Sequence, residues 1–297
     1  MNQAEVPPRT LGGILDASAA FLAARKIDEP RLAAEWLAAR LLRCGRLALH
    51  EKRAETLSEP LVEAMRRGIR RVASGEPVQY VVGRWEFRGH PMIVDRRALI
   101  PRPETEQLVQ LVLDARDLWQ NPAPLVVDIG TGSGCIAVSL ALERPQGRYL
   151  ATDISAEALA LAAENARLNA VESRINFAPA ELGDLLDDPG TVDIIVSNPP
   201  YIPSATVDKL GASVRDFEPR LALDGGPDGM GILRHIAEEA TMALRNGGGL
   251  FFELSAEQQQ AEAVEIYLRE LGFENIRIDR DLAGARRFIS ARLAAGV

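Results

Sequence analysis

From Asn121 onward, apolar strand-like segments alternate with helical segments, and this alternation constrains the fold more than any other feature. Strands are expected near residues 125–129, 148–153, 174–178, 192–197, 249–254, 275–280 and 286–292. Helices are expected near residues 134–143, 155–168, 229–245 and 256–271. Strands joined through helices are typical of a doubly wound, largely parallel α/β sheet that is covered on both faces. No helix separates the last two strands, so we expect that pair to be antiparallel.

A glycine-rich turn follows the first expected strand. Residues 130–134 read Gly-Thr-Gly-Ser-Gly, and a helix opens at Cys135. Glycine permits a tight turn and lets a ligand approach the backbone closely. A dinucleotide fingerprint requires G-x-G-x-x-G, whereas here the third glycine comes one residue early and Cys135 stands in its place. The turn therefore suits a ligand without phosphate, such as S-adenosylmethionine, better than a dinucleotide.

Asp153 ends the second expected strand, 19 residues after Gly134. An acidic residue at about this distance binds ribose hydroxyls in nucleotide-binding folds. Alternatively, Asp153 caps the helix that begins near Ser155. Both roles are compatible, because Ser155 is itself a good cap, and the preceding glycine turn favours the ribose role.

The strand over 192–197 runs into Asn198-Pro199-Pro200-Tyr201. Two prolines restrict φ and remove two backbone donors, so the turn is stiff and its carbonyls remain available as acceptors. Asn198 adds a side-chain carbonyl, and Tyr201 adds an aromatic face. We expect such a turn to hold a planar NH2 group and to favour the pyramidal nitrogen that develops as this group reacts. The alternative is a plain strand-ending turn, since Pro-Pro is common in loops.

Composition narrows the remaining possibilities. The chain has 297 residues and is 47% hydrophobic, which allows one large domain or two smaller ones. Cys44 and Cys135 are far apart, so we expect a reducing cytoplasmic location and no disulfide framework. The three histidines are scattered, which predicts no metal site. We expect no membrane span and no signal peptide, because the sequence lacks a run of 18 apolar residues and a basic-then-apolar start.

Charge is distributed unevenly along the chain. Residues 1–100 carry 17 Lys and Arg against 12 Asp and Glu, a net charge of +5, and residues 101–297 carry 17 against 30, a net charge of −13. An acidic half suits duplex DNA poorly, so we expect no stable nucleic-acid partner. The basic part is compatible with an acidic partner or RNA, but solvated helix faces are the simpler explanation.

Three domains are expected. Residues 10–75 show helical periodicity, with Thr10 as a cap, which predicts a helical bundle over 1–75. The β-type composition of 78–87, a turn at 89–91 and a return strand at 92–94 predict a connecting β-hairpin over 76–97. The sheet domain then covers 98–297. Within it, residues 202–228 lack periodicity and predict a long lid or substrate loop.

Five segments occur in an order that resembles a known family. They are Gly75–Tyr80, Leu99–Glu106, Asp128–Gly134, Ser197–Tyr201 and Phe217–Pro219. Together they resemble the bacterial peptide chain release factor N5-glutamine methyltransferases over nearly the whole chain. The Asn-Pro-Pro-Tyr turn is shared with adenine-specific DNA methyltransferases, whereas the Ile-Pro-Arg-Pro-Glu-Thr-Glu segment is more specific.

The resemblance implies a seven-stranded, Rossmann-like methyltransferase sheet with an N-terminal helical domain. It implies S-adenosylmethionine as methyl donor and, as substrate, the glutamine of the Gly-Gly-Gln motif in release factors, which the helical domain would dock. One alternative is an amino-group methyltransferase acting on another protein glutamine, as in a ribosomal protein, or on a nucleic-acid base. Another is a non-catalytic binding module, which the two intact turns argue against.

The resemblance also assigns residues. Cofactor contacts are expected from Gly130, Thr131, Gly132, Ser133, Gly134, Asp153, Glu181, Leu182 and Asn198. Substrate contacts are expected from Asn198, Pro199, Pro200 and Tyr201, and the catalytic residues among them are Asn198, Pro199 and Tyr201. Asp184 is an alternative to Glu181 and Leu182 beside the adenine.

Acidic residues at two places in the sequence keep open roles. Glu253 is followed by Leu254-Ser255 where the family tends to carry glycine at the second position, so a structural role at a strand end is as compatible as a site role. Glu104, Thr105 and Glu106 begin a helix, where acids favour the first turn. The resemblance places this segment against the active site and so implies a contact with substrate or cofactor, without assigning it to one residue.

Overall fold

The computed structural model describes residues 9–179, 189–256 and 258–295. The chain divides into two compact units. The first comprises Met1–Arg84 and Ala212–Phe217, and the second comprises Trp85–Gly211 and Glu218–Val297. In the described ranges, no helix is long and apolar enough to cross a membrane.

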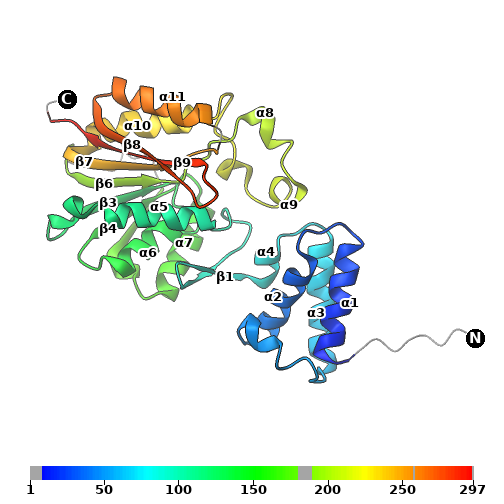
Figure 1. Cartoon of the computed structure of the whole chain (residues 1–297). Coiled ribbons are helices and arrows are strands. Elements are labelled where there is room, and N and C mark those ends of the chain that lie inside the picture. The colour runs from blue at the N-terminus through cyan, green and yellow to red at the C-terminus, as the bar shows by residue number, and fades with distance from the viewer. Residues whose placement is uncertain (1–8, 180–188, 257, 296–297) are drawn as a thin grey trace, which may run out of the picture. The chain divides into compact units, whose positions relative to one another are not determined.

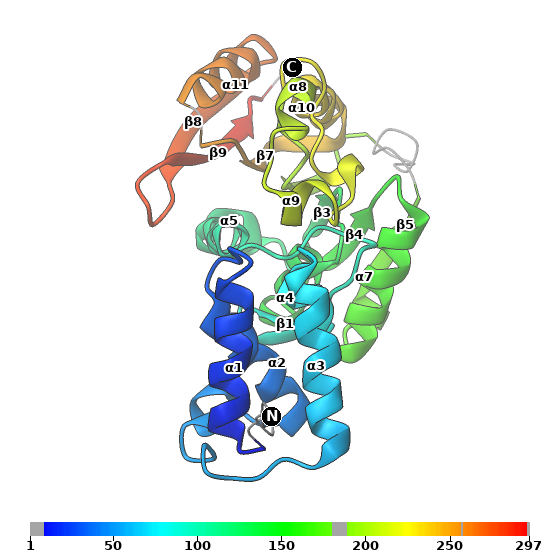
Figure 2. The same cartoon turned by 90° about the vertical axis from the view of Figure 1, so that its right-hand side faces the viewer.

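The first unit is built from helices. Its main elements are α1 (Leu11–Ala23), α2 (Pro30–Leu42), α3 (Glu59–Ala73), α4 (Val78–Val82) and the short α9 (Ala212–Arg215). Thr10 caps α1, as predicted, by accepting a hydrogen bond from the Gly13 amide at 3.3 Å. The first three helices lie side by side (Figure 2). Gly68 lets α3 approach α2, because a Cβ there would meet Leu37 at 2.3 Å.

The segment 78–82 is helical, which corrects the predicted strand over 78–87. Tyr80 and Val82 are buried, and Val78 and Val81 pack against the core of the first unit. Burial on a helical face here outweighs the β propensity of valine. The hairpin is shorter than predicted and consists of β1 (Arg84–Phe87) and β2 (His90–Ile93). The turn falls at Arg88 and Gly89, which both have positive φ, so His90 and Pro91 lie in a strand.

The second unit contains a seven-stranded sheet. Its strands are β3 (Leu125–Ile129), β4 (Arg148–Thr152), β5 (Ile175–Ala178), β6 (Val192–Ser197), β7 (Leu244–Glu253), β8 (Phe273–Arg280) and β9 (Arg286–Leu293). Their order is β5-β4-β3-β6-β7-β9-β8. The first five strands are parallel, and β9 is antiparallel to both of its neighbours. The predicted sheet and its antiparallel final pair are therefore confirmed.

Helices cover both faces of the sheet, as expected for a doubly wound fold. They are α5 (Pro103–Asp114), α6 (Cys135–Glu143) and α7 (Ala156–Leu168) on one face, with α10 (Gly231–Ala243) and α11 (Gln258–Glu270) on the other (Figure 1). Every residue of β6 is buried, which explains its continuous apolar sequence.

The strand order creates a crevice at one edge of the sheet. β3 pairs with β4 on one side and with β6 on the other, with Val126 opposite Ile194 and Asp128 opposite Val196. The strand order therefore reverses at β3, because β4 and β5 lie on one side of it and β6 and β7 on the other. Ligands of open α/β sheets bind outside the carboxyl ends of the strands at such a point. The glycine turn and the Asn198 turn both start there.

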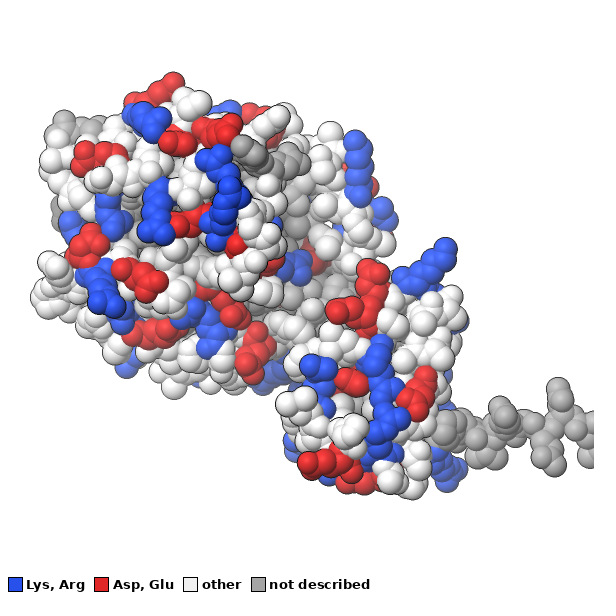
Figure 3. Space-filling view, viewed as in Figure 1, with Lys and Arg blue, Asp and Glu red and all other residues white. Residues whose placement is uncertain are grey.

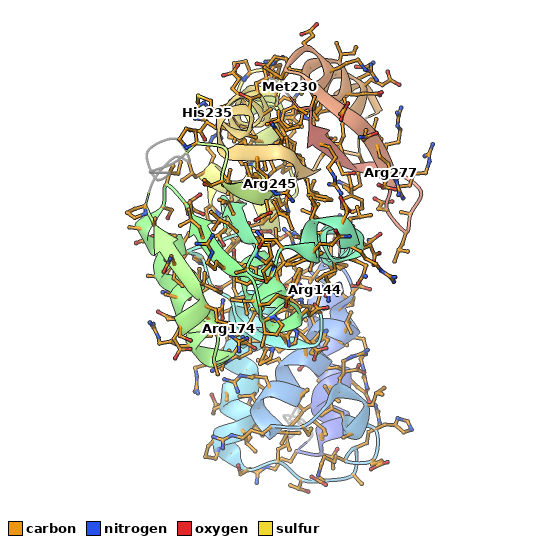
Figure 4. All side chains as sticks on the ribbon, turned by 90° about the vertical axis from the view of Figure 1, so that its left-hand side faces the viewer. Arg144, Arg174, Met230, His235, Arg245 and Arg277 are labelled. Carbon is orange, nitrogen blue, oxygen red and sulfur yellow. The ribbon has the colours of Figure 1, made fainter. Side chains whose placement is uncertain are left out.

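Three arginines that Figure 4 labels lie near the amino ends of the strands, at the end of the sheet opposite the crevice. Arg144 donates to the Leu113 carbonyl, and Arg174 donates to the Ala141 carbonyl, both at 3.1 Å. Arg245 pairs with Asp193 at 2.6 Å. These contacts join helix and strand ends at the amino side of the sheet and leave the carboxyl side for a site.

The segment 202–228 contains short helices, so the predicted long loop is only partly irregular. They are α8 (Ser204–Val207), α9 and a 3-10 helix over Arg220–Ala222. A parallel bridge joins Ile202 to Asp224, which returns the segment to the end of the Asn198 turn.

Candidate active site

A cavity of about 240 Å³ opens at the carboxyl ends of β3, β4 and β6. Its lining includes these predicted site residues: Gly130, Thr131, Gly132, Ser133, Asp153, Asn198, Pro199 and Pro200. Gly134 and Tyr201 lie outside the lining, and Glu181, Leu182 and Asp184 lie outside the described residues. Ile154, Ile232 and His235 also line the cavity, the last two from α10. Figure 4 labels His235 on this helix.

Two glycines of the turn at 130–134 have different surroundings. Gly130 has φ +68°, and an added Cβ would meet no described atom within 4 Å. Gly134 has φ +80°, and an added Cβ would lie 2.9 Å from the Ala162 Cβ of α7. Gly130 therefore leaves open space beside its backbone, whereas Gly134 allows the turn to pack against α7.

Asp128 anchors the glycine turn, a role that the sequence analysis missed. Its Oδ2 accepts hydrogen bonds from Thr131 Oγ1 at 2.6 Å and from the Ala137 amide at 3.2 Å. Burial raises the pKa of Asp128 to about 7, against the opposing effect of these two hydrogen bonds. The signal for this role was a single acid inside an otherwise apolar strand.

Asp153 joins the end of β4 to the glycine turn. Its Oδ2 accepts a hydrogen bond from the Gly132 amide, and its Oδ1 accepts one from the Ser155 amide, both at 2.9 Å. Ser155 caps α7 by accepting from the Ala158 amide at 3.2 Å. A carboxylate oxygen has two lone pairs, so Asp153 retains acceptor capacity toward the cavity. Its neighbour Ile154 is 64% exposed and offers an apolar surface there.

Side chains from three elements hold the turn at 198–201 in place. Ser197 Oγ donates to the Ile129 carbonyl at 2.7 Å, and Asn198 Nδ2 donates to Thr105 Oγ1 at 3.0 Å. Gln260 Nε2 donates to the Tyr201 carbonyl at 3.1 Å. Among the described residues, none donates a hydrogen bond to Asn198 Oδ1 or to the Pro199 carbonyl. The arrangement can therefore accept two hydrogens from one NH2 group.

Glu253 lies behind this turn, at the end of β7. Its Oε2 accepts from Thr105 Oγ1 at 2.7 Å, and its Oε1 accepts from the Tyr201 hydroxyl at 3.4 Å. Burial raises the pKa of Glu253 to about 7, although Thr105, Arg287 and Tyr201 all act in the other direction. Burial and the charge of Glu253 also raise the pKa of Tyr201.

Two of the quoted sequence segments meet beside the cavity. Glu218 is buried, and its Oε2 accepts from the Ile100 amide at 3.1 Å. Its other oxygen pairs with Arg102. Glu218 thus joins the segment that begins at this residue to the start of α5, a contact that the sequence did not predict.

Surface charge, metal-binding groups and the Cys135 thiol give no sign of another chemistry among the described residues. On the face shown in Figure 3, Lys and Arg alternate with Asp and Glu and form no broad patch of one sign. Within residues 9–179, 189–256 and 258–295, no three His, Cys, Asp or Glu side chains are grouped to hold a metal ion. Burial raises the pKa of the Cys135 thiol, which disfavours a thiolate nucleophile.

Comparisons with known proteins identify both parts of the chain. The family model of the PrmC N-terminal domain matches residues 14–83, and the model of the methyltransferase small domain matches residues 109–213. A methyltransferase structure from Pyrococcus furiosus superposes with a TM-score of 0.52 at 17% identity, covering 70% of this chain and 90% of that one. At this identity the likeness shows a shared fold.

Two curated relatives extend the match over most of the chain. The release factor glutamine methyltransferase of Chlorobaculum tepidum is 44% identical over 250 residues, covering 82% of this chain and 85% of that protein. The enzyme of the same name from Nitratidesulfovibrio vulgaris is 40% identical over 292 residues and covers 98% of both chains. The chain therefore belongs to the release factor glutamine methyltransferase family.

Proposed function

We propose that this protein methylates the N5 amide nitrogen of the glutamine in the Gly-Gly-Gln motif of release factors. The observation that carries the proposal is that Asn198 and Pro199 line the same cavity as the glycine turn at residues 130–133. A glutamine side chain ends in a planar NH2 group, which matches two fixed oxygen acceptors. The names of the two relatives described above point to release factors as the substrate.

The polar and apolar groups that line the cavity suit S-adenosylmethionine. Residues 130–133 would lie along the methionine part, because open space beside Gly130 permits close approach. Gly134 lets this turn pack against α7. Asp153 would bind the ribose hydroxyls, and Ile154 would cover one face of the adenine. The cofactor supplies an electrophilic methyl group on a sulfonium sulfur.

The turn at 198–201 would bind the substrate amide. Asn198 Oδ1 and the Pro199 carbonyl would each accept one N–H of the glutamine. The amide lone pair is delocalised into its carbonyl, so the nitrogen is a weak nucleophile. Acceptors placed for a pyramidal nitrogen stabilise the transition state more than the planar ground state. Pro200 stiffens the turn, and Tyr201 is held behind it by Glu253.

Each part of the chain would have its own role. The helical domain, residues 1–75, would dock a part of the release factor other than its Gly-Gly-Gln loop. Residues 76–97 would form the connector, and residues 98–297 would form the methyltransferase domain. Such a reaction belongs in the cytoplasm, where release factors act.

Transfer of label from S-adenosylmethionine tests the proposal. Purified protein is incubated with a full-length release factor, or with the same factor carrying Asn or Glu in place of the motif glutamine. We expect label on the unchanged factor alone, because the shortened amide falls short of the cavity and the carboxylate has no NH2 group. Label on a ribosomal protein, on RNA or on DNA, with none on the release factor, would refute the proposal.

A further inference from the structure

Three side chains from separate elements form a hydrogen-bonded chain behind the cavity. Asn198 follows β6, Thr105 lies in the first turn of α5, and Glu253 ends β7. Asn198 Nδ2 donates to Thr105 Oγ1 at 3.0 Å, and Thr105 Oγ1 donates to Glu253 Oε2 at 2.7 Å. Thr105 and Glu253 are each only 2% exposed.

The direction of these hydrogen bonds follows from the chemistry of the last member. An ionised carboxylate only accepts, so the single hydroxyl proton of Thr105 must point to Glu253. The Thr105 oxygen can then only accept from its other neighbour. Asn198 must therefore turn its Nδ2 toward Thr105, which directs Oδ1 along the other branch of the planar amide.

Building on the proposed function, we propose that Thr105 and Glu253 are positioning residues that determine which end of the Asn198 amide faces the substrate. With Oδ1 facing the substrate, Asn198 accepts a hydrogen from the incoming NH2 group. With the amide reversed, Nδ2 would meet that group as a second donor, and the acceptor would be lost. The two ends of an asparagine amide have nearly the same shape, so packing alone distinguishes them weakly.

The burial of Glu253 supports a function beyond holding β7 in place. Burying a carboxyl group is costly, and an apolar side chain would fill a strand end at less cost. Its two oxygens nevertheless bind two side chains that lead to the same turn, Thr105 and Tyr201. A buried acid with this pair of contacts is a fixed acceptor directed at residues 198–201.

The charge of Glu253 responds to groups on every element around it. Arg287 of β9 favours its ionised form, and Glu104 of α5 opposes it. Arg287 also forms an ion pair with Asp281 at 3.2 Å. The negative charge of Glu253 in turn contributes to the raised pKa values of Tyr201 and of the buried Cys135 thiol. Burial dominates and raises the pKa of Glu253 to about 7. Below this pH, the protonated Glu253 can donate a hydrogen bond, so the Thr105 hydroxyl no longer has to point toward it. Thr105 can then donate to Asn198, and the Asn198 amide can reverse.

Steady-state kinetics of matched variants tests the proposal. Thr105→Val keeps the shape and removes the hydroxyl, Thr105→Ser keeps the hydroxyl, and Ser139→Ala removes a buried hydroxyl elsewhere. We expect Thr105→Val to lower kcat by about 10-fold to 100-fold, less than the roughly 10²-fold to 10³-fold that is lost when a preorganised contact is removed outright. The dissociation constant of S-adenosylmethionine should stay within about twofold. Thr105→Ser should restore most of kcat, and Ser139→Ala should retain it.

The pH profile separates positioning from a purely structural role. Wild-type kcat should fall as the pH drops through about 7, the pKa of Glu253. Glu253→Gln keeps an acceptor but cannot titrate. The kcat of this variant should therefore not fall as the pH is lowered from 8 to 6. A Thr105→Val variant with unchanged kcat, or with only a lower melting temperature, would overturn the proposal.

A measurement without substrate tests the positioning role separately from the proposed function. In 15N-labelled protein, the side-chain NH2 of Asn198 should be protected from solvent exchange by Thr105, and Thr105→Val should remove that protection. An unchanged exchange rate overturns the positioning role whichever substrate is methylated. If the acceptor proves to be another NH2 group, the same kinetic comparison applies to it.

Discussion

Asn198 has a different neighbour at each end of its amide group, and this asymmetry is the central feature of the site at the residue scale. Nδ2 binds Thr105, while Oδ1 and the Pro199 carbonyl form an acceptor pair at the cavity. The value of such a pair depends on its fixed position, which the proline-stiffened turn and the Ser197 and Gln260 contacts provide.

We therefore predict that Asn198→Ala lowers kcat by about 10²-fold or more, as removal of one preorganised transition-state contact does elsewhere. Binding of S-adenosylmethionine, measured by calorimetry, should change by less than about fivefold, because residues 130–133 and Asp153 are untouched. A kcat near the wild-type value would show that Asn198 serves only the turn.

The ionisation of a single residue, Asp128, makes the free energy of unfolding depend on pH. Its pKa is raised from 3.8 to about 7 in the folded protein, so the folded state binds a proton more tightly than the unfolded chain. The free energy of unfolding therefore loses this contribution as the pH rises from about 4 to 7.

Asp128→Asn should remove this dependence and keep an acceptor for Thr131. We expect similar melting temperatures for variant and wild type near pH 4, and a higher one for the variant at pH 8. The difference should be about 2–4 °C for each kcal/mol recovered. Calorimetry across this pH range measures it, and parallel curves for the two proteins would contradict the assignment.

At the scale of elements, the glycine turn between β3 and α6 combines a packing role and a binding role. Gly134 packs against α7, whereas Gly130 leaves space beside the cavity. Both have positive φ, so alanine at either position costs about 1 kcal/mol or more in backbone strain alone.

This pair provides an internal control for a prediction. Gly134→Ala should lower the free energy of unfolding by about 2–4 kcal/mol, because strain is added to the 2.9 Å clash with Ala162. Gly130→Ala should lower it by roughly the strain term alone and mainly weaken cofactor binding. Urea unfolding and calorimetric titration of both variants check this. Equal losses of stability would contradict it.

At the scale of the whole molecule, charge separates protein substrates from nucleic acid. The net charge is −8, and residues 101–297 carry 17 Lys and Arg against 30 Asp and Glu. Duplex DNA binding depends on neutralised phosphates, so an acidic catalytic part lacks its main source of affinity.

We expect no binding of a 20-base-pair duplex by fluorescence anisotropy at 150 mM salt, up to about 100 μM protein, near the weak limit of non-specific binders. The same titration with a release factor should give a saturable signal. Saturable, salt-sensitive DNA binding in the micromolar range would restore the nucleic-acid alternative.

The order of elements was predictable from the sequence because each local pattern agrees with the fold. Strands such as Val192–Ser197 are buried on both faces and therefore read as continuous apolar runs. The glycine and Asn-Pro-Pro-Tyr turns follow strands that become neighbours, so their meeting at one edge was also foreseeable. The helix at Val78–Val82 was not, because its valines favour strands until the core of the first unit buries them.

What the sequence alone determined is the sheet, its turns and the residue types at the cavity, since these depend on periodicity and backbone restriction over short stretches. Tertiary structure decided the partners. Thr105, Asn198 and Glu253 are separated by 93 and 148 positions along the chain, counted from Thr105. Only the packing of α5 beside β6 and β7 brings them within hydrogen-bond distance, and burial there, which no local pattern reports, raises the pKa of Glu253.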